Sequence, residues 1–255
     1  MNKKVHCIVC GDDVVFIKKA GHRLVPNHLW NIVKCCACGL EFCSPMPSKR
    51  QIDSFYSNYT DIRASPEVLI ENGKKNIKKL REYGINKRSH LLDFGCGKGI
   101  FTQYGGKLWK KYDRYTCDQR DLLKKEIYDC VTLWGVLEHV VDPMQTLKEV
   151  YDYLRSDGII ALTTVSTETA IPYRFKPPEH VTFWTKHSIE KLFKKSGFKL
   201  VSCDSYTMSQ KREVYMEAIL RTMPLILKKK VDFTKLPKMI KNLPTNEIFV
   251  VGKKL

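Results

Sequence analysis

The stretch LLDFGCGKGIF, which runs from Leu91 to Phe101, decides the fold of this chain. A short apolar run ends in an acid, three glycines follow at alternate positions, and apolar residues resume at Ile100. This order predicts a buried strand, a tight turn and the start of a helix. Glycines suit such a turn because its backbone adopts unusual dihedral angles and lets a ligand approach the helix amides closely.

Asp93, close before the first glycine, indicates the class of ligand. Glycine-rich turns also open dinucleotide sites, but a phosphate gains nothing from a neighbouring carboxylate, whereas a cationic ligand does. The stretch resembles the first motif of the class I S-adenosylmethionine-dependent methyltransferases, whose glycines approach the methionine and ribose of the cofactor. The resemblance implies S-adenosylmethionine as the cofactor, and the implied contact residues are Asp93, Phe94, Gly95, Cys96 and Gly97.

A second block resembles the same superfamily. Residues 129–134 predict a buried strand, and the following GVLEHVVDP, residues 135–143, resembles the Val-Leu-Glu-His block found after the fourth strand in that superfamily. The resemblance implies a Rossmann-like α/β sheet with an antiparallel last strand, expected at 247–252, and it places Trp134 beside the cofactor. Glu138 and His139 either act on the substrate or only hold the turn after the strand.

The segment between the two blocks is short. We expect a helix over 101–112 and the next strand over 114–118. In the resembled family an acid after the second strand binds the ribose hydroxyls, which selects Asp118. Only about ten residues then remain before Tyr128, fewer than a parallel crossover needs. The sequence therefore predicts that one βα unit is missing or severely shortened: either the third unit is lost, or Asp118 lies near the adenine and the second unit is lost.

Cysteines near the N-terminus predict a metal site. Two Cys-x-x-Cys pairs, each followed by glycine or by Gly-Leu, have the spacing of a zinc ribbon that binds one ion through Cys7, Cys10, Cys35 and Cys38. Unrelated buried thiols, redox chemistry and an iron–sulfur cluster are the alternatives. Histidines nearby, including His22 and His28, are interpreted as surface residues or substitute ligands. We expect a zinc ribbon over 1–47 and a methyltransferase domain over 48–255.

The acceptor is suggested by a looser resemblance. The ribbon, a Pro45-Met46-Pro47 connector and a Phe-Tyr-x-x-Tyr segment ahead of the methyltransferase domain are similar to bacterial sugar methyltransferases, including C-methyltransferases that act on nucleotide-linked deoxysugars. PPEHVTFWT, residues 177–185, resembles their Glu-His-x-x-Phe segment, in which the Glu-His pair lies by the acceptor. The resemblance implies a carbohydrate acceptor served by Glu179 and His180, with His139 in reserve. Anchoring of the loop is the alternative role.

Composition excludes few other functions. The 255 residues carry a net charge of +17, mostly from dispersed lysines that we interpret as solvated faces rather than a polyanion surface. An RNA methyltransferase and a non-catalytic zinc-ribbon protein remain the rival hypotheses. No apolar run is long enough for a membrane span, and no convincing signal peptide is present, so we expect a cytoplasmic protein. Core packing is the default interpretation of the apolar stripe in the insert 206–246, and the alternatives are an acceptor lid or a peripheral contact of its segment 224–231 with anionic lipid.

Overall fold

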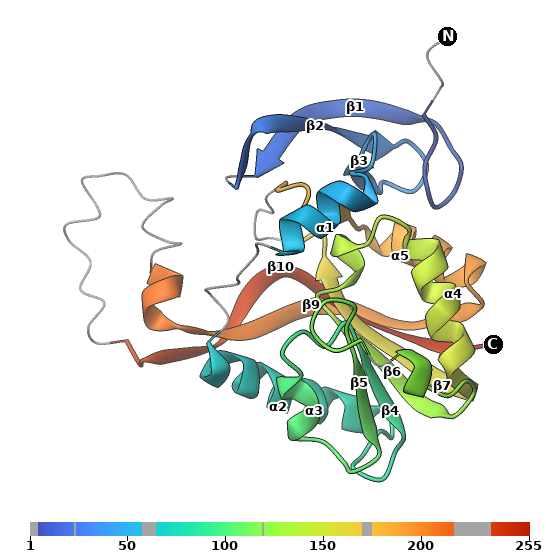
Figure 1. Ribbon diagram of the computed structural model, residues 1–255, viewed down its shortest axis with the longest axis vertical. Helices are drawn as coiled ribbons and strands as arrows, with labels where there is room; N and C mark the ends of the chain where they lie inside the picture. Colours follow the sequence, from blue (N-terminus) through green and yellow to red (C-terminus); the bar gives the residue numbers. More distant parts are fainter. Residues whose placement is uncertain (1–4, 23, 58–64, 119, 170–174, 217–235) are drawn as a thin grey trace.

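The structure is a computed structural model that describes residues 5–22, 24–57, 65–118, 120–169, 175–216 and 236–255. A six-stranded sheet lies between two layers of helices, and a four-stranded sheet lies beyond one end of it (Figure 1). Among the described residues, no helix combines the length and the apolar character that a membrane span requires. The predicted lipid contact at 224–231 and the centre of the predicted lid lie outside the described residues.

The larger sheet has the strand order β5-β4-β6-β7-β10-β9. Its first four strands are parallel, whereas β10 is antiparallel to both of its neighbours, which confirms the expected Rossmann-like sheet with an antiparallel last strand. Central parallel strands are apolar along their length because both of their faces are covered. The strands are β4 (Leu91–Phe94), β5 (Trp109–Tyr112), β6 (Tyr128–Trp134), β7 (Leu154–Val165), β9 (Phe198–Lys211) and β10 (Met239–Lys254).

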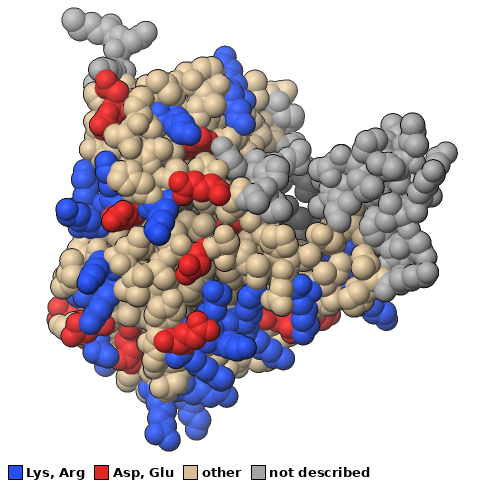
Figure 2. All heavy atoms as spheres, turned by 180° about the vertical axis from the view of Figure 1, so that it is seen from behind, with Lys and Arg blue, Asp and Glu red and all other residues tan. Residues whose placement is uncertain are grey.

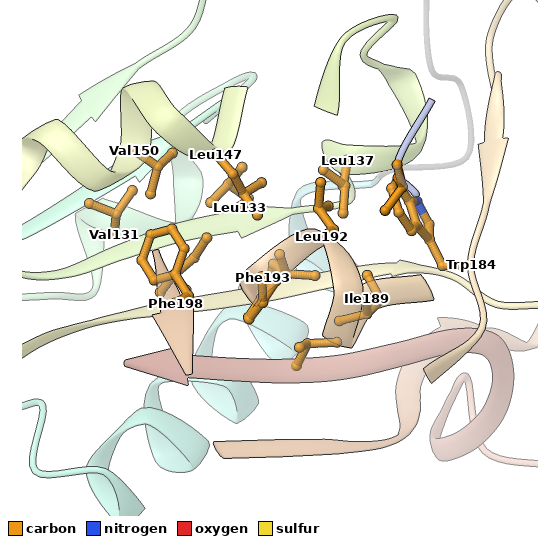
Figure 3. Packing of buried hydrophobic residues seen from close by; sticks show 14 of the residues in the cluster. Val131, Leu133, Leu137, Leu147, Val150, Trp184, Ile189, Leu192, Phe193 and Phe198 are labelled. Atoms are coloured by element: carbon orange, nitrogen blue, oxygen red, sulfur yellow. The ribbon is translucent and has the colours of Figure 1, made fainter. Parts of the chain in front are cut away.

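Two helices cover each face of this sheet. α4 (Pro143–Tyr153) and α5 (Lys186–Lys195) pack on one face, and α2 (Pro66–Glu82) and α3 (Ile100–Gln103) on the other. The first layer is seen in Figure 3, where side chains of α4 and α5 lie over those of β6: Leu147, Val150, Leu192, Phe193, Val131 and Leu133. Ser65 and Asp142 cap α2 and α4, since each accepts a hydrogen bond from an amide of the first turn.

The predicted helix over 101–112 is wrong in its extent. α3 ends at Gln103, and the chain returns at once to form β5. The Gly105-Gly106 pair explains this turn, because a Cβ at Gly105 would overlap the ring of Trp109, and one at Gly106 would overlap the main-chain carbonyl of Lys87. Glycine is therefore needed where the chain reverses beside the loop that precedes β4.

The predicted strand over 114–118 is also wrong. The second strand is β5, and the acid that follows it is Asp113, whereas Asp118 lies in an exposed turn. Among the described residues between β5 and β6 there is only a short 3-10 helix, η1 (Arg120–Leu122), so the missing unit is confirmed. It is the third unit that is absent, and β5 becomes the edge of the sheet.

The smaller sheet joins the N-terminal segment to the rest of the chain. Its order is β1 (Val14–His22), β2 (Val25–Cys35), β3 (Glu41–Cys43) and β8 (Thr182–Phe183), all antiparallel. The last strand comes from the segment that follows Glu179 and His180. One continuous core includes buried residues of both sheets, and Trp184, fully buried, lies within it.

The β9–β10 hairpin takes up both ends of the predicted insert. The last strand begins at Met239 rather than near Glu247, and it pairs with β9 out to Lys211, so both ends of the predicted insert are strand.

On the face drawn in Figure 2, basic side chains are interspersed with acidic ones. Several form surface ion pairs, such as Lys253 with Asp157 at 2.9 Å, which accords with solvated lysine faces.

Substitution at the Gly105-Gly106 turn tests this account of β5. We expect Gly106→Ala to lower the free energy of unfolding by about 3 kcal/mol, because the main chain must shift away from Lys87. Gly84→Ala is the matched control: Gly84 has φ +81°, but a Cβ there would meet no other atom within 4 Å, so left-handed strain alone should cost about 1 to 2 kcal/mol. Urea unfolding measures both, and equal losses would contradict the steric explanation.

Candidate active site and thiol cluster

The glycine turn after β4 is held in place by the neighbouring strand. The amides of Gly95 and Cys96 donate to the main-chain carbonyl of Tyr112, at 2.7 and 3.0 Å. The amide of Gly97 donates to Oδ2 of Asp113 at 3.0 Å. The turn therefore depends on β5 and on the acid that follows it.

Glycine is required in this turn for two reasons. Gly95, Gly97 and Gly99 all have positive φ, at 79°, 50° and 67°. A Cβ at Gly95 would also lie 2.5 Å from a methyl group of Val136, in the block after β6. The turn thus packs directly against the second block that the sequence singled out, and the two motifs form one site.

Two acids on adjacent strands converge on the turn. Asp93 is 2% exposed and accepts a hydrogen bond from Oγ1 of Thr132 at 2.8 Å. Burial raises the pKa of the Asp93 carboxyl to about 7, and the charge of Asp113 also raises it. A cationic ligand beside the two carboxylates would offset this unfavourable burial, which fits the ligand class inferred from the sequence.

The other predicted cofactor residues are placed differently. The Phe94 ring packs on Tyr112, with ring centroids 5.0 Å apart, so its side chain belongs to the core. The Trp134 ring stacks on Phe249, and its indole N–H is buried without an acceptor among the described residues. A buried donor without a partner is unfavourable, and a ligand atom at the carboxyl end of β6 would satisfy it. Cys96 is half-buried within the turn itself.

Two histidines far apart in sequence meet beyond the carboxyl end of β6. The rings of His139 and His180 lie edge to face with centroids 4.7 Å apart. Nδ1 of His139 lies 2.7 Å from the main-chain oxygen of Glu179, which can only accept, so Nδ1 carries the proton and Nε2 the lone pair of the neutral ring. In its neutral form, His139 would therefore present Nε2 as a basic nitrogen on its other side.

Glu179 is buried and lies close to a lysine and a histidine. Its Oε1 lies 2.8 Å from Nζ of Lys176, and its Oε2 lies 3.1 Å from Nε2 of His22. Nε2 of His180 is 3.9 Å from the same carboxylate. Since both oxygens of Glu179 already have close partners, the carboxylate is better suited to orient His180 than to remove a proton itself.

α1 (Lys49–Ser57) connects this cluster to the glycine turn. The Tyr56 hydroxyl lies 2.7 Å from Nδ1 of His139, and its ring stacks on Tyr115 at 5.2 Å. The hydroxyl of Tyr115 donates to Asp53 at 2.9 Å, and its amide donates to Asp113. α1 therefore spans the two histidines and the acid of the glycine turn.

Glu138, beside these histidines, is held apart from solvent. Its side chain accepts a hydrogen bond from Oγ1 of Thr164 at 2.9 Å, and burial raises its pKa to about 8. Glu138, His139 and His180 bring three potential ligand atoms within 4.8 Å of one another. Because burial favours the protonated form of the Glu138 carboxyl, we interpret this group as acid–base chemistry.

The four predicted ribbon cysteines are brought together by two tight turns. Sγ of Cys7 lies 3.6 Å from Sγ of Cys38, and Sγ of Cys10 lies 3.3 Å from Sγ of Cys35. Four thiolates around one zinc ion lie about 3.8 Å apart, given zinc–sulfur bonds of about 2.3 Å. The sulfur separations thus fit a tetrahedral metal. Cys36 is exposed and Cys43 is buried, and both lie outside the group.

Comparison with protein families decides the class of protein. A family described as a methyltransferase domain matches residues 67–203, which is more than half of the chain. The chain belongs to the methyltransferase domain family. It is an S-adenosylmethionine-dependent methyltransferase, and the matched region contains both the glycine turn and the two histidines. No curated protein matches the sequence.

Solved structures resemble this methyltransferase at low identity. A putative methyltransferase from Bacillus halodurans is 14% identical, with 71% of this chain and 99% of that chain covered and a TM-score of 0.45. A possible histamine N-methyltransferase from Thermotoga maritima is 14% identical, with 74% and 91% covered and a TM-score of 0.47. A methyltransferase from Aquifex aeolicus is 13% identical, with 75% and 94% covered and the same score.

Some residues of the candidate site carry little sequence signal. Asp113 is hard to assign because the edge strand before it, β5, has only four residues, Trp-Lys-Lys-Tyr, and its two lysines are not typical of a buried strand. The Gly105-Gly106 pair is the one signal, since it indicates that the preceding helix has ended. His22 carries no signal at all, since its partner Glu179 lies 157 residues away in the chain. Lys176 and Glu179, three residues apart, are within reach of local reasoning.

An exchange of acids tests the correction at the cofactor turn. We expect Asp113→Asn to weaken binding of S-adenosylmethionine by about 10- to 100-fold, since hydrogen bonds to a charged group contribute about 1.5 to 3 kcal/mol. Asp118→Asn is the matched control and should change affinity less than twofold, because Asp118 is exposed, whereas Asp113 accepts a hydrogen bond from the amide of Gly97. Isothermal titration calorimetry measures both. A larger loss in Asp118→Asn would favour Asp118 as the ribose-binding acid.

Proposed function

We propose that this methyltransferase transfers the methyl group of S-adenosylmethionine to a sugar or a sugar-containing glycan precursor. The observation that carries the proposal is the meeting of His139 and His180, at 4.7 Å, beside Tyr56 and next to the glycine turn. A hydroxyl, or a carbon next to a carbonyl, must lose a proton as it accepts a methyl group, and a neutral imidazole is suited to take that proton.

Cofactor binding is assigned to the turn and its acids. The main chain at Gly95 and Gly97 would face the methionine part, the Asp93 carboxylate would lie near the positive charge, and Asp113 would accept from the ribose hydroxyls. When bound, the cofactor supplies an activated methyl group on a sulfonium. Loss of the third βα unit leaves the adenine end with fewer protein partners than the rest of the site.

The remaining work of the chain is alignment and proton removal. Holding the acceptor oxygen or carbon in line with the methyl group accounts for much of the acceleration of such a reaction. His180 is assigned as the base, oriented by Glu179, and the Nε2 lone pair of His139 can serve the same proton. Tyr56, within hydrogen-bonding distance of His139, would direct an acceptor hydroxyl or carbonyl toward the histidines.

Removal of single histidines tests the acceptor site. We expect His180→Ala to lower kcat/KM with a nucleotide-linked sugar by about 10²- to 10⁴-fold, the usual range for loss of a general base, with affinity for S-adenosylmethionine unchanged. His187→Ala, a histidine exposed on α5, is the control and should retain full turnover. Transfer of labelled methyl measures the rate. Full turnover in both His180→Ala and His139→Ala would remove the two histidines from the mechanism.

We also propose that Cys7, Cys10, Cys35 and Cys38 bind one structural zinc ion. The support is the donor set and the sulfur separations, which suit tetrahedral thiolate coordination. Protein purified without chelator should contain one equivalent of zinc, and Cys38→Ser should lose it, whereas Cys36→Ser should keep it because Cys36 is exposed outside the group. Plasma emission spectrometry measures the metal content. Protein that lacks zinc, or Cys36→Ser protein that loses it, would contradict the assignment.

A further inference from the structure

His22 connects the ribbon to the acceptor loop through a buried contact. It ends β1, and its side chain is 8% exposed although the sequence suggests a surface residue. Its Nε2 lies 3.1 Å from Oε2 of Glu179, whose side chain is 4% exposed. The His22 ring also packs edge to face on Phe55 of α1, at 5.0 Å. Three segments distant in sequence thus fix the position of this imidazole.

Main-chain contacts tie the same loop to the ribbon. β3 and β8 pair through Phe42 and Thr182, and the amide of Cys43 donates to the carbonyl of Val181 at 3.0 Å. Oγ1 of Thr185 donates to the carbonyl of Cys38, one of the four clustered cysteines, at 2.7 Å. The segment that carries Glu179 and His180 is therefore a strand of the ribbon sheet as well as a loop of the methyltransferase sheet.

We propose that His22 is a positioning residue for the acceptor site, and that the folded ribbon holds the Glu179-His180 loop in its working geometry through this contact. The proposal rests on the proposed function only in assigning that loop to the acceptor. The ribbon could either supply the His22 side chain to the site or only stabilise the fold. If it supplies the side chain, loss of His22 changes the site while the fold persists.

The titratable groups around Glu179 determine what loss of His22 does. Lys176 lies 2.8 Å from Oε1, from the loop itself. His180 lies 3.9 Å from Oε1 on the same loop, and His139 contacts the Glu179 carbonyl from the block after β6. Without His22, Oε2 loses its partner from β1, and the carboxylate turns toward Lys176 and His180. The expected result is a misdirected His180 with the cofactor turn unchanged.

The first experiment compares His22→Ala, His22→Gln and His28→Ala in the metal-loaded protein. His28 is the matched control, an exposed histidine on the neighbouring strand β2. We expect His22→Ala to shift the ¹⁵N imidazole resonance of His180, assigned by its loss in His180→Gln, and to lower kcat at least tenfold with affinity for S-adenosylmethionine unchanged. His22→Gln, whose amide can still donate to Glu179, should restore most of both. An unshifted resonance in His22→Ala would overturn the proposal, and so would a His22→Gln variant as impaired as His22→Ala.

The second experiment requires no acceptor. Hydrogen exchange followed by mass spectrometry should show faster exchange at 176–185 in His22→Ala and in protein treated with a zinc chelator, while 91–103 stays as protected as in the wild type. Unchanged exchange at 176–185 in both samples would overturn the link between ribbon and loop. Because this readout does not depend on turnover, a wild-type enzyme that fails to methylate sugars would refute the proposed acceptor and leave the positioning role standing.

Discussion

The pairing of β3 with β8 is the contact on which the arrangement of the site depends. It consists of two residue pairs, Glu41 with Phe183 and Phe42 with Thr182, yet it joins the N-terminal ribbon to the segment after β7. Because of this strand pairing, the loop that carries Glu179 and His180 is held between the two sheets and is not an exposed surface loop. Loops placed by a rigid scaffold commonly carry function, and here two scaffolds share one loop.

The glycine turn after β4 depends on few contacts with the rest of the sheet. β5 is a four-residue edge strand, but it supplies both the carbonyl of Tyr112 and the carboxylate of Asp113 that hold the glycine turn. The third unit can be absent because neither contact comes from it. Acids and main-chain amides at the carboxyl ends of adjacent parallel strands create the site, and the remaining strands support it.

Local patterns in the sequence predict local features well. Asp142-Pro143 and Ser65-Pro66 predict helix starts, the Cys-x-x-Cys pairs predict the thiol cluster, and the length after Asp118 predicts a missing unit. The errors arise where a tertiary contact overrides a local pattern. Lys110 and Lys111 resemble a helix surface in the sequence, although they pair with β4, and the contact of His22 with Glu179 joins residues that are distant in sequence. A side chain whose role depends on a residue 157 positions away cannot be assigned from one sequence.

Transfer of labelled methyl by the intact protein distinguishes a sugar acceptor from an RNA acceptor. Purified enzyme would be incubated with methyl-labelled S-adenosylmethionine and either nuclease-treated small molecules from cell extract or purified RNA. We expect label in the small-molecule fraction, in material that binds boronate. Mild acid, which hydrolyses nucleotide-linked sugars, should remove the labelled material from the boronate-bound fraction. Label that appears only in RNA, or S-adenosylmethionine recovered unchanged from both mixtures, would contradict this expectation.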